Sequence, residues 1–289
     1  MNNRNPGAWA PGLLFGPVRS IMKEIISAPG IEARESPILH RTELFSMTLF
    51  LTSSPCIYDH SPATLTEANG FLRRIRSKLP PKPKTLFVAS SPSREDHART
   101  DFYAGDMAGA FARAGIELPG WQLLDDLTAD RARELVAWSD FIILMGGHVP
   151  TQNAFFNRIN LKRLLQGYPG VIMGISAGTM NAAETVYAQP ESDGETASSF
   201  RRFYPGLGLT HINVCPHYQQ VKDWILDGKR LYGEVTESDS KLGHAFHIFP
   251  DGTYIYKDEQ EYAIFGQCWR MQNGITELLT GDGERLDLK

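Results

Sequence analysis

Clustered cysteine, long apolar runs and an excess of positive charge are all missing from this sequence of 289 residues. Its three cysteines, Cys56, Cys215 and Cys268, lie far apart and form no CxxC pair. This spacing excludes a disulfide framework and a thiolate zinc site, and it is typical of a reducing compartment. No stretch reaches the roughly 18 consecutive apolar residues that span a bilayer, so we expect no membrane association.

Basic residues do not predominate, with 29 Lys and Arg against 33 Asp and Glu and a formal net charge of -4. A protein that holds a phosphate backbone needs a clustered basic surface. The two short basic clusters, Arg73-Arg74-Ile75-Arg76 and Arg201-Arg202, are expected on solvated faces, and we expect no nucleic-acid partner. With 42% hydrophobic and 21% charged residues, the composition indicates an ordinary globular protein, which we expect to be cytoplasmic.

The first 46 residues differ from the rest of the chain, because proline and glycine recur throughout them. The apolar segment around Leu13 is shorter than the roughly 7–15 residues of a secretory signal, so we expect no cleaved signal. At Met47 an apolar run begins that turn residues end. We predict that residues 47–289 form a single α/β catalytic domain. We expect residues 1–46 to be a weakly ordered N-terminal extension or an over-extended gene start.

From Met47 onward, short apolar runs alternate with amphipathic segments. The runs typical of buried strands are residues 48–51, 85–89, 121–124, 140–145 and 171–175. The helical patterns are residues 64–78, 129–138 and 152–166, and a segment through Phe102, Met107, Phe111 and Ala114. This alternation predicts a mostly parallel sheet with helices on both faces. Later runs at 244–249, 253–256 and 262–265 are separated by turn signals and predict C-terminal β-hairpins.

The first candidate for chemistry is Ser176, in the segment Gly174-Ile175-Ser176-Ala177-Gly178. An apolar strand pattern leads into it and a helix-permissive segment comes after it, which is the context of a G-x-S-x-G nucleophile elbow. The N–H group after the serine then lies at a helix N-terminus, where it can stabilise an oxyanion. The alternative is that this turn only caps a helix.

A serine hydroxyl needs a base, and His217 is the best placed histidine. It follows the apolar residues 212–214, so we expect it at the carboxyl end of a strand, where sites gather in parallel sheets. The orienting carboxylate stays open among Glu184, on the predicted helix, and Glu191, Asp193 and Glu195, in the loop from 189 to 199. The carboxyl ends of the parallel strands form one rim of the sheet. The loop can fold back over this rim, or it can be a solvated surface loop.

A glycine pair, Gly146-Gly147, follows the predicted strand 140–145. Two glycines allow close approach of the backbone to a ligand, so the Gly147 N–H is a candidate second oxyanion donor. An ordinary glycine turn would look the same. The neighbouring His148 is a candidate for substrate contact, as is Tyr218 beside His217.

These motifs, in this order, resemble the dipeptidase E and cyanophycinase family of serine peptidases: Gly146-Gly147, then the Ser176 elbow, then Asn213-Val214-Cys215-Pro216-His217-Tyr218. The similarity runs from Met47 to about Leu279. The resemblance implies a class I glutamine amidotransferase-like, flavodoxin-like fold. It also implies that Ser176 is the nucleophile, His217 the base, Gly147 and Ala177 the oxyanion donors, and Glu191 the acidic member.

Two positions depart from the family pattern. Dipeptidase E proper cleaves after an N-terminal aspartate and uses a basic residue downstream of the histidine, whereas the stretch after His217 offers no clear match for its arginine. His148 stands where the family usually has a small polar residue. The sequence therefore predicts the hydrolytic core but does not predict aspartyl specificity.

We therefore expect a serine peptidase that acts on short peptides, without metal or cofactor, and a homodimer is compatible with the sequence. One alternative is an esterase that uses the same Ser176 elbow, although its His-Gly oxyanion motif is not found. The other is an amidotransferase-like domain that binds a small ligand without catalysis, which the set Gly147, Ser176 and His217 disfavours.

Overall fold

The computed structural model describes residues 47–57 and 62–289, which belong to one compact unit, Leu44–Lys289. The N-terminal extension expected over residues 1–46 lies outside the described residues. Each apolar run that predicted a buried strand before residue 176 forms one, because the run supplies side chains to both faces of a covered sheet.

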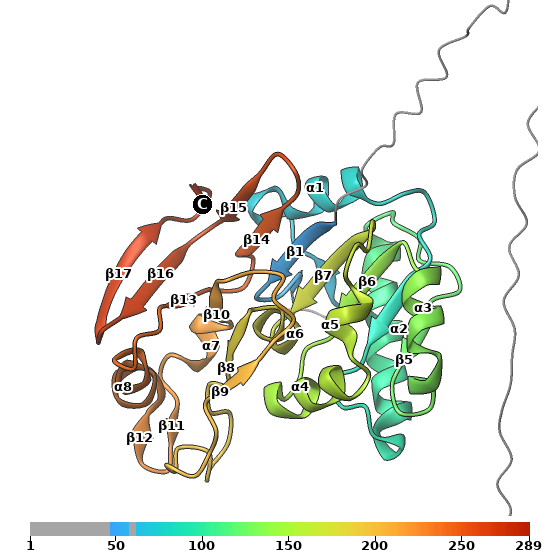
Figure 1. Ribbon diagram of the computed structural model, residues 1–289. Helices are drawn as coiled ribbons and strands as arrows, with labels where there is room; N and C mark the ends of the chain where they lie inside the picture. The colour runs from blue at the N-terminus through green and yellow to red at the C-terminus, as the bar shows by residue number, and fades with distance from the viewer. Residues whose placement is uncertain (1–46, 58–61) are drawn as a thin grey trace, which may run out of the picture. The chain divides into compact units, whose positions relative to one another are not determined.

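The main sheet has eight strands within the described ranges, in the spatial order β18-β15-β14-β1-β7-β6-β4-β5 (Figure 1). In that order their bounds are Arg285–Asp287, Tyr262–Phe265, Tyr254–Lys257, Thr48–Thr52, Val171–Ile175, Phe141–Leu144, Thr85–Val88 and Gln122–Leu124. Strands β1, β7, β6, β4 and β5 are parallel to one another. Strands β14, β15 and β18 continue the sheet on the other side of β1, in antiparallel pairs. Counted along the chain from β4, the spatial order β5-β4-β6-β7 is 2-1-3-4, which is the order of the first four strands in a flavodoxin-like sheet.

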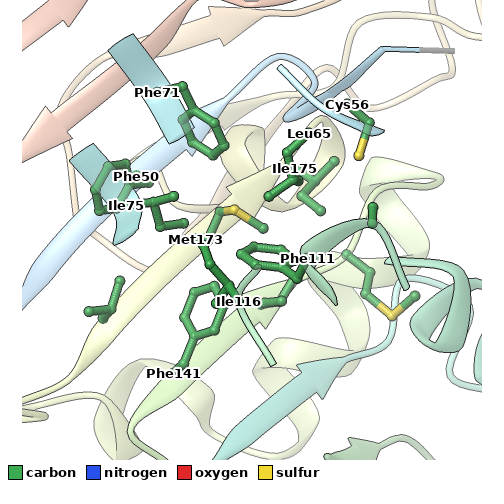
Figure 2. Close-up of a cluster of buried hydrophobic side chains, with 14 of the residues drawn as sticks. Phe50, Cys56, Leu65, Phe71, Ile75, Phe111, Ile116, Phe141, Met173 and Ile175 are labelled. Atoms are coloured by element: carbon green, nitrogen blue, oxygen red, sulfur yellow. The ribbon is translucent and has the colours of Figure 1, made fainter. Parts of the chain in front are cut away.

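Helices cover both faces of this sheet, as predicted. The helices on these faces are α1 (Phe71–Lys78), α2 (His97–Arg113), α3 (Ala132–Trp138), α4 (Val149–Arg158), α5 (Leu161–Leu164) and α6 (Ala177–Asn181). Two further helices, α7 (Tyr218–Val221) and α8 (Glu237–Ser240), lie beside a second sheet (Figure 1). Alternate residues of β6 divide between two apolar clusters. Phe141 and Ile143 pack with α1 and α2, as Figure 2 shows for part of that cluster, whereas Ile142 and Leu144 pack with α3, α4 and α5.

A second sheet, with the order β10-β13-β16-β17, lies beyond β14 and β15 and away from α2 and α3 (Figure 1). Its strands are β10 (Asn213–Cys215), β13 (Phe246–Ile248), β16 (Cys268–Gln272) and β17 (Ile275–Thr280). The described ranges also contain short antiparallel pairs: β2 (Cys56–Ile57) with β3 (Thr64–Leu65), β8 (Thr185–Tyr187) with β9 (Phe203–Pro205), and β11 (Ile225–Leu226) with β12 (Lys229–Arg230).

The structure corrects two helix boundaries. The pattern over residues 64–78 begins as strand β3, and α1 starts only at Phe71, because Asn69 and Gly70 have φ angles of 54° and 73°. The pattern over 152–166 divides into α4 and α5 at Asn160, whose φ is 54°. A left-handed residue ends the helical hydrogen bonding, and apolar periodicity on both sides does not reveal it.

The predicted C-terminal hairpins are present, but their strands belong to two different sheets. β14 and β15 pair with each other and extend the main sheet beside β1. The run predicted at 244–249 contains β13, which pairs in parallel with β10 in the second sheet. Across the described ranges, none of the helices combines the length and the apolar character needed to cross a membrane.

Candidate active site

Ser176 occupies the turn between β7 and α6, as the elbow motif predicts. Its φ and ψ are 50° and -112°, a conformation that non-glycine residues rarely adopt. The turn is tight enough that a Cβ on Gly178 would lie 2.2 Å from the Leu144 carbonyl oxygen. Only glycine therefore fits at that position without moving β6, which explains the small residue two positions after the serine.

The glycine pair lies beside this elbow, at the end of the neighbouring strand β6. A Cβ on Gly146 would lie 3.4 Å from the Ser176 Cβ, and a Cβ on Gly147 would lie 2.4 Å from the Ser90 hydroxyl. Within the described residues, the N–H groups of Gly147 and Ala177 donate no hydrogen bond. Both candidate oxyanion donors thus lie next to Ser176 with their N–H groups available.

His217 follows β10 and has a left-handed backbone, with φ 57° and ψ 29°. Its Nδ1 lies 2.8 Å from Oδ1 of Asp251, and its side chain is 27% exposed. A neutral imidazole that donates from Nδ1 to this carboxylate leaves Nε2 as a proton acceptor. The hydrogen bond therefore selects the tautomer that a general base needs.

Asp251 is the carboxylate bonded to His217, and the sequence analysis missed it. The carboxylate also accepts hydrogen bonds from the Ser53 hydroxyl at 2.7 Å and from the side-chain amides of Gln219 and Gln220 at 2.6 and 2.8 Å. Burial alone would raise the pKa of Asp251. The hydrogen bonds from His217, Ser53 and Gln219 outweigh burial and lower this pKa below its ordinary value.

The sequence does contain a signal for Asp251, namely its position just after an apolar run, but this segment was interpreted only as a turn. Asp251 follows β13 and His217 follows β10, and these strands are parallel neighbours whose carboxyl ends meet at one edge. The segment Pro250-Asp251-Gly252 has turn composition, which hid a side chain that belongs to the same rim as His217.

Ser53 connects the elements that carry these groups. It is fully buried at the end of β1, next to β7 in the sheet. Its carbonyl accepts the Ser176 N–H at 3.1 Å, and its hydroxyl accepts the His217 N–H at 2.8 Å while donating to Asp251. In the described residues no hydrogen bond joins the Ser176 hydroxyl to His217. Catalytic hydrogen bonds often tighten only when substrate is bound.

The acidic residues considered from the sequence lie elsewhere. The predicted Glu191 is not bonded to His217, because Asp251 occupies that position. The loop from 189 to 199 does reach the rim, but through Glu195, whose Oε1 lies 3.1 Å from Nε2 of His148. Asp193 accepts the Asp227 N–H at 2.9 Å, and Glu184 is exposed beyond the end of α6.

Glu191 nevertheless has an unusual environment. Although the residue as a whole is exposed, protein atoms crowd its carboxyl group. This desolvation, followed by the charge of Glu195, raises the pKa of Glu191 to about 7. The Glu191 N–H donates to Oε2 of Glu195 at 2.8 Å, so the two residues are held together.

The two residues suggested for substrate contact differ in their surroundings. His148 lies directly after Gly147, and its Nδ1 is 2.7 Å from the Thr151 hydroxyl. The Tyr218 ring packs against Tyr232 and Trp269, with centroids 5.1 and 4.9 Å away, so it supports the second sheet. No group of three His, Cys, Asp or Glu side chains in the described part of the chain is arranged to hold a metal ion.

Comparisons with known proteins agree with this fold. The chain is similar in structure to a peptidase from an acI-B1 Actinobacterium, with a TM-score of 0.59, 18% identity, and coverage of 83% of this chain and 96% of the other. It is also similar to a candidate peptidase E protein from Listeria monocytogenes EGD-e, with a TM-score of 0.50, 18% identity, and coverage of 81% and 99%.

The sequence comparisons identify the family. No curated protein matches the chain significantly. The model of peptidase family S51 matches residues 49–261, which include the elbow, the glycine pair, His217 and Asp251. The resemblance to the dipeptidase E family is thereby confirmed, and the chain belongs to peptidase family S51.

Proposed function

We propose that this peptidase is a serine hydrolase of short peptides in which Ser176, His217 and Asp251 act together. The observation that carries the proposal is the hydrogen-bonded link through Ser53. This buried residue binds the backbone of Ser176, the backbone of His217 and the carboxylate of Asp251. One residue thus bonds to the proposed nucleophile, base and acid, which supports their acting together.

In the first half of the reaction, the Ser176 oxygen attacks the carbonyl carbon of the scissile peptide. His217 Nε2 takes the hydroxyl proton, and the Asp251 carboxylate stabilises the imidazolium that forms. The negative charge that develops on the carbonyl oxygen is stabilised by the N–H groups of Gly147 and Ala177. The C–N bond then breaks as His217 donates its proton to the leaving amine.

In the second half, water hydrolyses the acyl group on Ser176. His217 takes a proton from the water, whose oxygen attacks the ester carbonyl, and then returns that proton to the Ser176 oxygen as it leaves. The lowered pKa of Asp251 keeps its carboxylate ionised, which this role requires. In this mechanism the chemistry uses side chains and backbone groups of the chain itself.

The test has two parts, covalent labelling and hydrolysis of a dipeptide library. We expect a fluorophosphonate to label the wild-type protein and not Ser176→Ala, and we expect Ser176→Ala to lose hydrolysis. Asp251→Asn removes the charge that orients His217, and we expect a rate lower by a factor on the order of 10²–10⁴. Glu191→Gln is the matched control and should keep nearly the full rate.

Three outcomes would contradict the proposal. Labelling that persists in Ser176→Ala would exclude this serine as the nucleophile. Absence of both labelling and hydrolysis in the wild type would favour a small-ligand binding domain. A large loss in Glu191→Gln with a full rate in Asp251→Asn would return the acidic role to Glu191.

A further inference from the structure

A cavity of about 610 Å³ opens directly beside the candidate oxyanion donor. Gly146 and Gly147 form part of its wall, and it extends from them towards α2. Its volume is within the range of about 300–1,000 Å³ typical of sites for small molecules. If the Gly147 N–H binds the carbonyl of a substrate residue, the side chain of that residue can therefore enter this cavity directly.

The inner wall of the cavity is mostly apolar and carries no charge, although the buried hydroxyl residues Ser90 and Thr100 also line it. Phe87, Ala110 and Ile143 line it and are almost fully buried, and Ile175 is 9% exposed. Ile175 and Cys56, which also lines the cavity, lie near each other at one end of the buried cluster in Figure 2. Such a wall favours an apolar group, because the group leaves water without leaving any polar atom unpaired.

The charged residues of the lining, within the described ranges, already have partners of opposite charge. Arg99 lies 2.7 Å from Asp96, and Asp106 lies 3.9 Å from Arg113. The Arg99 and Asp106 side chains are 59% and 44% exposed, so they belong to the mouth of the cavity. A carboxylate inside would lose its hydration and gain no counter-ion from the inner wall.

The topology of the sheet indicates which part of the substrate meets this cavity. β7, which carries Ser176, lies between β1 and β6. Ser53, which follows β1, bonds to His217, whereas the glycine pair and most of the cavity lining come from β6, β4 and α2, with Cys56 at one end of the cavity. Because His217 must protonate the leaving amine, the leaving residue lies on the β1 side, and the acyl residue lies on the side of the cavity.

We propose that this cavity binds a large apolar side chain, aromatic or long aliphatic, of the residue whose carbonyl is attacked. The substrate class is then short peptides with a hydrophobic residue on the acyl side of the cleaved bond. This assignment rests on the proposed function of Ser176. It differs from the aspartate preference of dipeptidase E, since the inner wall provides no cation for a carboxylate.

The first experiment compares kcat/KM of the full-length wild-type protein for the dipeptides Phe-Ala, Leu-Ala, Ala-Ala, Lys-Ala and Asp-Ala, with Ser176→Ala as the blank. We expect Phe-Ala or Leu-Ala to exceed both Ala-Ala and Asp-Ala by at least about tenfold, the scale of discrimination in an apolar pocket. A preference for Asp-Ala or Lys-Ala would overturn the assignment of the cavity.

The second experiment narrows the cavity. Ala110→Leu adds volume to its wall, and Ala112→Leu makes the same change at an exposed position of α2. We expect Ala110→Leu to lower kcat/KM for Phe-Ala at least about tenfold more than for Ala-Ala. Ala112→Leu should leave this ratio unchanged. An equal loss for both substrates in Ala110→Leu would overturn the proposal.

A third measurement uses the wild-type protein alone, so it does not depend on the folding of a variant. Diphenyl phosphonates label the active serine, and their side chain next to phosphorus takes the place of the acyl residue's side chain. The labelling rates of a benzyl and a carboxymethyl compound therefore compare how well the pocket accepts an apolar and a charged side chain. We expect faster labelling of Ser176 by the benzyl compound. Equal rates, with Ser176 labelled by both, would overturn the cavity assignment and leave the proposed function intact. No labelling and no hydrolysis of any dipeptide would overturn the proposed function, and the cavity assignment with it.

Discussion

At the scale of single residues, the hydroxyl of Ser53 links His217 to Asp251. It is fully buried, accepts the His217 N–H and donates to the Asp251 carboxylate, with a longer contact of 3.5 Å to the Phe249 carbonyl. In a buried environment such bonds are stronger than in water, and a bond to a charged group contributes about 1.5–3 kcal/mol. Ser53 is a positioning residue, because it acts on the reaction through His217 and Asp251.

Ser53→Ala should lower kcat/KM by roughly 10- to 100-fold, the factor that corresponds to the loss of such a bond. It should also change the pH profile. With one donor fewer, the Asp251 carboxylate becomes more basic and holds the proton of the imidazolium more tightly. We therefore expect the acidic limb of the kcat/KM profile to move to higher pH.

Ser54→Ala is the matched control for this variant. Ser54 is also buried, but its hydroxyl bonds only to the backbone of Cys56 among the described residues. A drop in activity of the same size in both variants, with neither pH limb displaced, would assign Ser53 a purely structural role.

At the scale of elements, the loop from 189 to 199 is held by hydrogen bonds of residues 194–196. The Asp227 carboxylate accepts the Gly194 N–H at 2.8 Å and the Thr196 hydroxyl at 2.6 Å. Glu195 reaches His148 beside the glycine pair. The Glu191 N–H donates to the Glu195 carboxylate, which keeps the two residues close together, so the Glu191 carboxyl group is ionised at a cost in free energy.

Glu191→Gln should therefore stabilise the protein in a pH-dependent manner. Because the folded-state pKa of Glu191 is raised from 4.5 to about 7, the stability it contributes is complete below pH 4.5 and is lost as pH rises through 7. Relative to wild type, we expect Glu191→Gln to have the same Tm near pH 4 and a higher Tm at pH 8, in thermal unfolding followed by circular dichroism.

The Glu184→Gln protein provides the comparison, since it removes the same charge outside this loop. A gain of the same size and pH dependence in that variant would contradict the assignment to Glu191. A Tm difference that is constant from pH 4 to pH 8 would contradict it as well.

At the scale of the whole molecule, three apolar clusters built from residues 47–289 pack against the main sheet. The site residues come from the ends of β1, β6, β7, β10 and β13, all after residue 47. Deleting residues 1–46 should leave the Tm within about 2 °C of the full chain and retain fluorophosphonate labelling of Ser176. Loss of the cooperative unfolding transition, or of labelling, would show that the extension is required.

The sequence was sufficient wherever the signal is local. The β6 run, in which Phe141 and Ile143 alternate with Ile142 and Leu144, predicts a strand covered on both faces because successive side chains point to opposite sides. The Ser176 elbow was likewise predictable, since the motif and the strand before it are contiguous. His217 was found because it follows an apolar run and so lies at a strand's carboxyl end.

Only the tertiary structure decided which carboxylate joins this histidine and what lies beside the serine. Ser53 and Asp251 are 198 residues apart, and Ser53 and His217 are 164 apart. The pairing of β10 with β13 brings Asp251 to His217, and the pairing of β7 with β6 brings the glycine pair to Ser176. Such contacts depend on the order and register of strands, which local patterns of hydrophobicity do not encode, because each strand pattern is compatible with many neighbours.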